Sequence, residues 1–144
     1  MIKLVNWQQF NRGVFLVNLL GIVYNPKIKK ILIGQRTNDP HLKNLSWTFP
    51  GGRPAYKKDL EYYLKLEIKK KTNLNVKVKD IVFAKTYPEK REFLSVYFLC
   101  EIVKGKEKAG EKFSELKWIK PMEVKKYFTT SIHPTLFKYL KKLK

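Results

Sequence analysis

The stretch WTFPGGRPAYKKDLEYYLKLEIKKKTNL, residues 47–74, decides how this chain can fold. Residues 47–50 are a short extended piece that ends at the glycine pair Gly51 and Gly52. Residues 57–71 contain neither glycine nor proline and place apolar side chains at helical spacing. The stretch therefore predicts an extended segment, a glycine turn and a helix, in that order.

Strands are predicted on both sides of this stretch. In chain order they cover residues 12–24, 31–36, 76–87, 92–103 and 114–120. The turn residues 88–91 join the third and fourth of them into a hairpin. A short helix is expected to open at Pro121, and a C-terminal helix over residues 134–143. Strands before, between and after helices predict an α/β fold with a mixed sheet and helices on its faces.

The composition fits one folded domain over residues 1–144. Hydrophobic residues make up 44% of the chain, and no linker or repeat divides it. No apolar run is long enough to span a bilayer, which predicts no membrane partner. The N-terminal MIKLVNWQQF lacks the layout of a signal peptide, which predicts a cytoplasmic protein, and this segment could pair across a homodimer. The single cysteine, Cys100, lies in an apolar strand and is expected in the core.

The charge of the chain is strongly positive. Thirty-one Lys and Arg against 12 Asp and Glu give +19, and all but four of the cations are lysines. Such a field attracts nucleotides and nucleic acids. The alternative is a compositional bias, because the lysines are scattered along the chain and not confined to one segment. The charge permits weak, non-specific nucleic-acid binding but does not by itself predict a dedicated site.

Residues 47–74 resemble the Nudix box and its lead-in. In that family a W-x-[FL]-P-G-G approach feeds a loop and then a helix with the pattern Arg-Glu-aliphatic-x-Glu-Glu-x-Gly-aliphatic. With Gly52 as the anchor, four positions keep the family's residue type: Gly52, Glu67, Ile68 and Leu74. Five differ: Lys58 for the first Glu, Leu66 for the Arg, Lys70 and Lys71 for the Glu pair, and Asn73 for the Gly.

Two further segments extend the resemblance over nearly the whole chain. ILIGQR, residues 31–36, stands where the family has a strand that ends in a basic residue. EKFSELKWI, residues 111–119, is similar to the family's closing strand and precedes a predicted helix. The resemblance implies the Nudix fold, an α/β/α sandwich with a mixed β-sheet.

The substitutions fall where the family binds its metal. Pyrophosphate cleavage needs Mg²⁺ to neutralise the phosphates and to activate or orient water. The family supplies carboxylates from one helix face, which here carries Glu67, Lys70 and Lys71. Two ammonium groups beside one carboxylate oppose a dication, so we expect no tightly bound cofactor. The two lysines could bind phosphate directly, or only complement the helix C-terminus and extend to water.

The resemblance supplies further candidate residues. GQRTNDP and PGGR look like the GDP-mannose mannosyl hydrolase branch, in which both arginines contact the diphosphate, so Arg36 and Arg53 would inherit that role. Arg36 could equally brace the loop before Trp47. The histidine base of that branch is matched here by Phe113. Glu111 and Glu115 fall in the region from which the family draws an extra carboxylate for metal binding or general base catalysis, although a surface role is open for Glu111.

Three functions stay open. In the first, the domain binds a nucleoside-diphosphate-type ligand through the two arginines, Lys70, Lys71 and the glycine pair, and magnesium-dependent pyrophosphohydrolase activity is weak or lost. In the second, it hydrolyses a nucleoside diphosphate linked to another group. That hydrolase would use a reduced Mg²⁺ site built from Glu67, a carbonyl of the glycine pair, and Glu111 or Glu115 as tentative catalytic residues. The third is a non-catalytic RNA-binding module that uses the basic surface and the tyrosines.

Overall fold

The computed structural model describes residues 12–37 and 47–143. The N-terminal segment for which we predict a dimer contact, and residues 38–40 of GQRTNDP, lie outside the described residues. The strands are β1 (Leu16–Asn25), β2 (Lys30–Arg36), β3 (Trp47–Thr48), β4 (Gly51–Gly52), β5 (Asn75–Tyr87), β6 (Lys90–Lys104) and β7 (Phe113–Ile119). The helices are α1 (Leu60–Thr72), the 3₁₀ helix η2 (Pro121–Glu123), α2 (Val124–Tyr127) and α3 (Pro134–Lys141).

The strands form a mixed sheet, as the sequence predicts. Its order is β3-β2-β1-β6-β5, with β4 paired to β1 and β7 paired to β2. β1 and β6 run parallel, from Leu16 beside Phe93 to Val23 beside Cys100. The other pairs are antiparallel, and β5 and β6 form the predicted hairpin.

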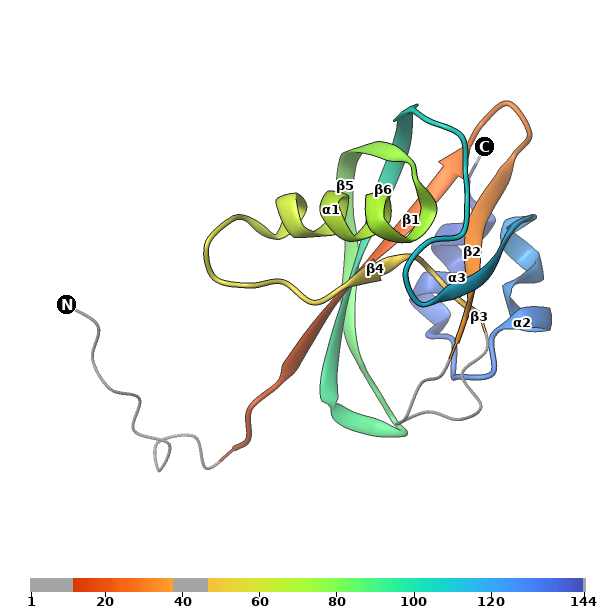
Figure 1. Cartoon of the computed structure of the whole chain (residues 1–144). Helices are drawn as coiled ribbons and strands as arrows, with labels where there is room; N and C mark the ends of the chain where they lie inside the picture. Colours follow the sequence, from red (N-terminus) through yellow and green to blue (C-terminus); the bar gives the residue numbers. More distant parts are fainter. Residues whose placement is uncertain (1–11, 38–46, 144) are drawn as a thin grey trace.

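Helices cover both faces of this sheet because its central strands alternate their apolar side chains between two cores. The core beneath α1 contains the buried residues Leu19, Val23, Leu32, Leu64, Ile68, Leu74, Val76, Phe98 and Cys100. The core on the opposite face, beneath α2 and α3, contains Leu20, Ile22, Tyr24, Ile31, Ile33, Phe49, Tyr97, Ile119, Val124, Leu136 and Leu140. This arrangement is the α/β/α sandwich that the resemblance implies (Figure 1).

The helix predicted over residues 57–71 is observed as Leu60–Thr72, so its predicted start is wrong by three residues. Asp59 has an extended backbone, and its carbonyl accepts the N–H of Tyr62 at 3.1 Å. The absence of glycine and proline shows where a helix is permitted and not where it begins. At the other end Asn73 has a φ of 66°, the left-handed conformation that asparagine tolerates. Asn73 therefore keeps the backbone role of the glycine that the family has there.

α1 lies close to the sheet because β1 has a glycine beneath it. A Cβ atom at Gly21 would lie 2.6 Å from Cδ1 of Ile68, so a larger residue there would push the helix outward. This contact places the last turn of α1 over the point where β4 joins β1. Among the described residues, no helix is both long and apolar enough to cross a membrane.

Candidate functional site

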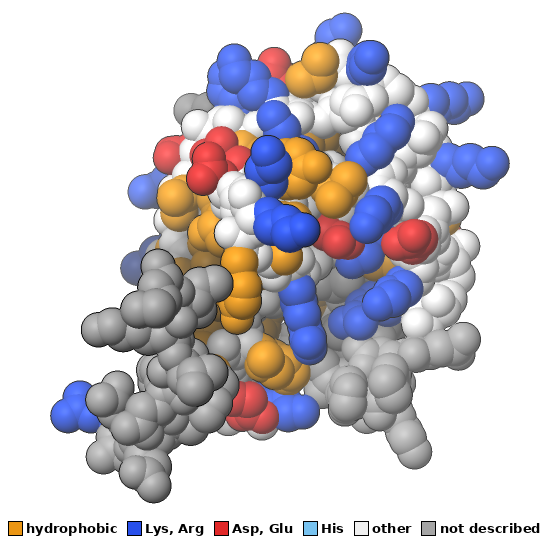
Figure 2. Space-filling model, turned by 60° about the vertical axis from the view of Figure 1, so that its left-hand side comes forward, with side chains coloured by type: hydrophobic (Ala, Val, Ile, Leu, Met, Phe, Trp, Pro, Cys, Tyr) orange, Lys and Arg blue, Asp and Glu red, His pale blue; other side chains and the backbone are white. Residues whose placement is uncertain are grey.

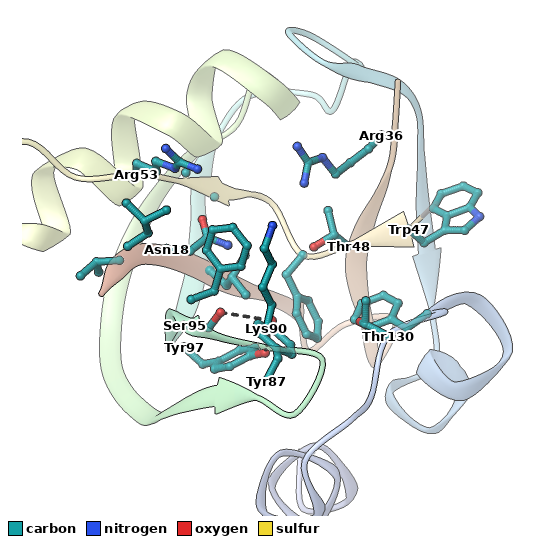
Figure 3. Close-up of a pocket in the computed structure, with 18 of the residues that line it drawn as sticks. Asn18, Arg36, Trp47, Thr48, Arg53, Tyr87, Lys90, Ser95, Tyr97 and Thr130 are labelled. Carbon is teal, nitrogen blue, oxygen red and sulfur yellow. Dashed lines mark hydrogen bonds between the residues drawn. The ribbon is translucent and has the colours of Figure 1, made fainter. Parts of the chain in front are cut away.

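A cavity of about 560 Å³ opens between the sheet, the last turns of α1, the β5–β6 hairpin and residues 128–132 (Figure 3). The charged side chains of the described residues that line it are Arg36, Arg53, Lys71, Lys90, Lys112, Glu67 and Glu89. Five cations therefore face two carboxylates. The cavity is thus suited to an anionic ligand.

One end of the cavity is built around Lys71, in the last turn of α1. Its Nζ donates a hydrogen bond to the carbonyl oxygen of Gly51 in β4. It also lies 3.5 Å from Oε2 of Glu67, one helical turn earlier. The side chains of Lys71 and Glu67 are 15% and 21% exposed, so this ion pair is largely shielded from water. We call Lys71, Glu67 and Gly51 the ammonium cluster.

The pKa of Lys71 depends on burial and on the charges around the ammonium cluster. Burial lowers the pKa below the ordinary lysine value, and Glu67 offsets part of that effect. Arg36 and Lys112 lower it further, because each places a second positive charge near the ammonium group. Three cations therefore converge at this end of the cavity, where a bound anion would relieve their mutual repulsion.

The glycine pair is required by two close approaches. A Cβ atom at Gly51 would lie 1.8 Å from the carbonyl oxygen of Leu19, so only glycine lets β4 pair this closely with β1. A Cβ atom at Gly52 would lie 2.6 Å from Cγ of Glu67. The glycines therefore admit the Glu67 side chain and direct a backbone carbonyl toward Lys71.

The two predicted diphosphate ligands, Arg36 and Arg53, both line the cavity. Arg36 ends β2, and Arg53 follows β4. Figure 3 shows their guanidinium groups extending toward each other from opposite sides of the opening. Residues far apart in the sequence thus supply cations to one space, as the first of the three hypotheses requires.

Other candidate residues lie away from the cavity. Lys70 is 43% exposed, lies 3.9 Å from Glu67 and is not among the lining residues. Glu111 and Glu115 are exposed and are not among the lining residues, whereas their neighbours Lys112 and Phe113 are. Lys58, at the first Glu position of the box, is exposed and places its Nζ 5.9 Å from the ring of Tyr62.

The described residues do not fit a magnesium ion. Mg²⁺ in proteins takes octahedral oxygen ligands and favours sites with one or two carboxylates. Here the Glu67 side chain lies against Gly52, and the ammonium group of Lys71 already contacts both the Glu67 carboxylate and the Gly51 carbonyl. The described part of the chain contains no group of three or more His, Cys, Asp or Glu side chains placed to hold a metal.

The floor of the cavity is a hydroxyl network that was not predicted from the sequence. Oγ of Ser95 donates to the hydroxyl of Tyr87 at 3.1 Å, and that hydroxyl lies 3.1 Å from the hydroxyl of Tyr97 (Figure 3). Asn18 stands beside Ser95 on the adjacent parallel strand and also lines the cavity. Burial raises the pKa of Tyr97, so its phenol stays protonated as a hydrogen-bonding group. The signal in the sequence was a polar residue inside each of two apolar strands.

A second set of contacts fixes the wall of the cavity that residues 128–132 form. Oε1 and Oε2 of Glu89, in the hairpin turn, accept hydrogen bonds from the N–H and the hydroxyl of Ser131 at 3.2 and 3.1 Å. Nζ of Lys85 donates to the carbonyl of Ser131 at 3.3 Å and lies 4.2 Å from the centre of the Tyr87 ring. These contacts, which we call the hairpin latch, hold the wall against β5.

The fold and the site geometry agree with the match of the chain to a protein-family model. The model of the NUDIX domain matches residues 15–140, and the chain belongs to this family. A search of curated proteins found no match.

Solved structures with the same fold include several Nudix proteins. A NUDIX hydrolase from Nitrosomonas europaea superposes with a TM-score of 0.74 and 17% identity, covering 90% of this chain and 72% of that one. A MutT protein from Methanosarcina mazei Go1 gives 0.72 and 15%, covering 90% and 95%. An ADP-ribose pyrophosphatase from Streptococcus suis gives 0.60 and 17%, covering 74% of each chain. At these identities the likeness shows the fold alone.

Proposed function

We propose that this Nudix domain binds a nucleoside diphosphate derivative in the cavity, and that magnesium-dependent hydrolysis by the box is weak or lost. The observation that carries the proposal is that Arg36, Arg53, Lys71 and Lys112 all line one cavity, with the guanidinium groups of Arg36 and Arg53 on opposite sides of its opening. Guanidinium and ammonium groups are the side chains that bind phosphate oxygens. A diphosphate between them would replace repulsion among cations by attraction.

The rest of the cavity supports the nucleoside part of such a ligand. Beside the hydroxyl floor its described lining is apolar and includes rings from Trp47, Phe49, Phe93, Phe113 and Phe128. Phe49 and Phe128 meet edge to face, with ring centres 5.0 Å apart. Apolar walls with a few placed polar groups are typical of small-ligand sites. Among the similar structures, an ADP-ribose pyrophosphatase and a UDP-X diphosphatase are named for nucleoside diphosphate derivatives.

Weak or lost hydrolysis follows from the ammonium cluster. A box that cleaves pyrophosphate needs carboxylates to hold a divalent cation near the scissile bond. The structure offers Glu67 there, already paired with Lys71. Glu111 and Glu115, which the reduced-site alternative requires, are exposed and stand outside the described lining.

The proposal is tested by calorimetric titration of ADP-ribose and GDP-mannose into the protein in the presence of EDTA. Arg36→Gln and Arg53→Gln should each weaken binding by about tenfold or more, because each removes a charge-assisted hydrogen bond. Arg12→Gln is the matched control, since Arg12 is exposed and does not line the cavity. Phosphate release should be no faster with Mg²⁺ than without it.

Two results would contradict this function. The first is equal affinity of the wild-type protein and both cavity variants, which would place the ligand elsewhere. The second is Mg²⁺-dependent turnover that disappears in Glu67→Gln, which would favour the reduced-site hydrolase.

A further inference from the structure

We propose that the ammonium group of Lys71 takes the place of the divalent cation in this site, so that the cavity recognises a diphosphate in its metal-free form. The choice of ligand rests on the proposed function. The position of the cation does not, because it can be tested with a metal alone.

The position is defined by two oxygens from different parts of the chain. The carbonyl oxygen of Gly51 and Oε2 of Glu67 both contact Nζ of Lys71. A divalent ion held by these oxygens would lie about 2.0–2.6 Å from each of them. Nζ already fills the space between them, and its charge repels a dication.

An ammonium group is also suited to what a ligand would need there. It has three N–H donors, and the contacts with Gly51 and Glu67 account for two of them. Because Lys71 also lines the cavity, the third can serve a phosphate oxygen of the ligand. Burial at 15% side-chain exposure holds the group in place and strengthens its attraction for an anion.

The neighbouring lysine, Lys70, differs from Lys71 in exposure and in position. It replaces the neighbouring glutamate of the box, yet its side chain is 43% exposed and it does not line the cavity. The helix turns the two side chains about 100° apart, so one faces the glycine carbonyl and the other faces water. The substitution at position 71, and not the one at position 70, therefore removes the metal position.

A metal-free site and a magnesium-dependent site predict opposite effects of Mg²⁺ on ligand affinity. Mg²⁺ bound to a diphosphate occupies the oxygens that Lys71 would contact and reduces the negative charge that Arg36 and Arg53 attract. Excess Mg²⁺ should therefore weaken ligand binding to this protein. A site that uses Mg²⁺ as its bridging cation would bind more tightly under the same conditions.

The first experiment titrates Mn²⁺ alone into three proteins and follows free Mn²⁺ by its electron paramagnetic resonance signal. The wild-type protein and Lys70→Glu should show no site tighter than about millimolar. Lys71→Glu should gain a site at least about tenfold tighter, because it adds a carboxylate beside Glu67 and frees the Gly51 carbonyl. A site in the wild-type protein, equal gains in both variants, or no gain in folded Lys71→Glu would overturn the proposal.

The second experiment measures ADP-ribose binding with EDTA and with excess Mg²⁺. Wild-type affinity should fall in Mg²⁺, whereas Lys71→Met should bind about tenfold more weakly in EDTA and recover affinity in Mg²⁺. The same sign of the Mg²⁺ effect in both proteins would overturn the metal-free assignment. If the wild-type protein binds no nucleotide under either condition, the proposed function fails, and the Mn²⁺ titration still decides the position of the cation.

Discussion

Two lysines with little exposed side chain, Lys71 and Lys85, are each stabilised in a different way. Lys71, on α1, contacts the Glu67 carboxylate and the Gly51 carbonyl and lines the cavity. Lys85, on β5, is 8% exposed and contacts the Ser131 carbonyl and the Tyr87 ring in the hairpin latch. Burial lowers the pKa of both.

The difference shows what each positive charge is placed to do. Lys71 sits beside further cations at an opening, so its charge is directed at something that enters the cavity. Lys85 is absent from the cavity lining and holds a carbonyl of the wall segment, so its charge serves the fold. We infer that a shielded ammonium group indicates a ligand site only where one of its N–H donors still faces a cavity.

The largest expected effect comes from breaking the ion pair between Lys71 and Glu67. Glu67→Gln should lower the free energy of unfolding by about 2 kcal/mol, less than the 3–5 kcal/mol of a fully buried pair. The reduction reflects the partial exposure of both side chains. Urea unfolding at neutral pH measures the change.

Glu89→Gln is the matched variant at the hairpin latch. Glu89 is exposed, so this change should cost less than about 1 kcal/mol. Equal losses in the two variants would remove the distinction between the ammonium cluster and the hairpin latch.

A smaller effect is expected in the pH dependence of the free energy of unfolding. The folded-state pKa values of Lys71 and Lys85 lie below the ordinary 10.5. Between each folded-state pKa and 10.5, the unfolded chain therefore binds more protons than the folded protein does. The contribution of each lysine to stability therefore rises as pH rises through its folded pKa toward 10.5. Lys71→Met and Lys85→Met should each flatten the stability profile of the wild-type protein, by about 1 kcal/mol or less.

Glu67→Gln sharpens the same test. Because Glu67 raises the pKa of Lys71, its removal should extend the rising part of the profile to lower pH. Urea unfolding at pH values up to that of ordinary tyrosine ionisation checks this, because the raised pKa of Tyr97 works in the opposite direction above pH 10.0. A profile in Lys71→Met identical to that of the wild-type protein would mean that Lys71 titrates normally.

Much of this architecture could be predicted because it depends on local patterns. The apolar strands, the hairpin and the register from Gly52 to Glu67 follow from spacing along the chain. The burial of Cys100 also followed from its strand, and the structure confirms it. Helix periodicity placed Glu67 and Lys71 on one face, which is the basis of the ammonium cluster.

The rest depended on contacts between distant segments. Asn18 and Ser95 are neighbours only because β1 and β6 pair in parallel in one register, which no local pattern specifies. Lys85 is one of several lysines on β5, and its burial depends on where Ser131 packs. Lys71 could be interpreted as a solvated residue until the Gly51 carbonyl was placed against it.

The smallest expected effect tests whether the remaining lysines, like Lys71, are placed to bind a ligand. Figure 2 shows Lys and Arg side chains dispersed over the visible face, with no single basic patch. We expect single-stranded RNA to bind weakly at low salt and to be released between roughly 50 and 200 mM salt, because the attraction depends on counterion release.

Tyr56 provides the sharpest probe, because it is fully exposed next to Lys57 and Lys58 and could stack a base. Dispersed charge predicts that Tyr56→Ala changes RNA affinity by less than about twofold, since stacking contributes only where a base is held. Fluorescence anisotropy with a labelled oligonucleotide across a salt series measures it. Affinity that persists at high salt and falls in Tyr56→Ala would show a dedicated RNA site. In that case the exposed lysines near α1, and not only those in the cavity, would be placed to bind a ligand.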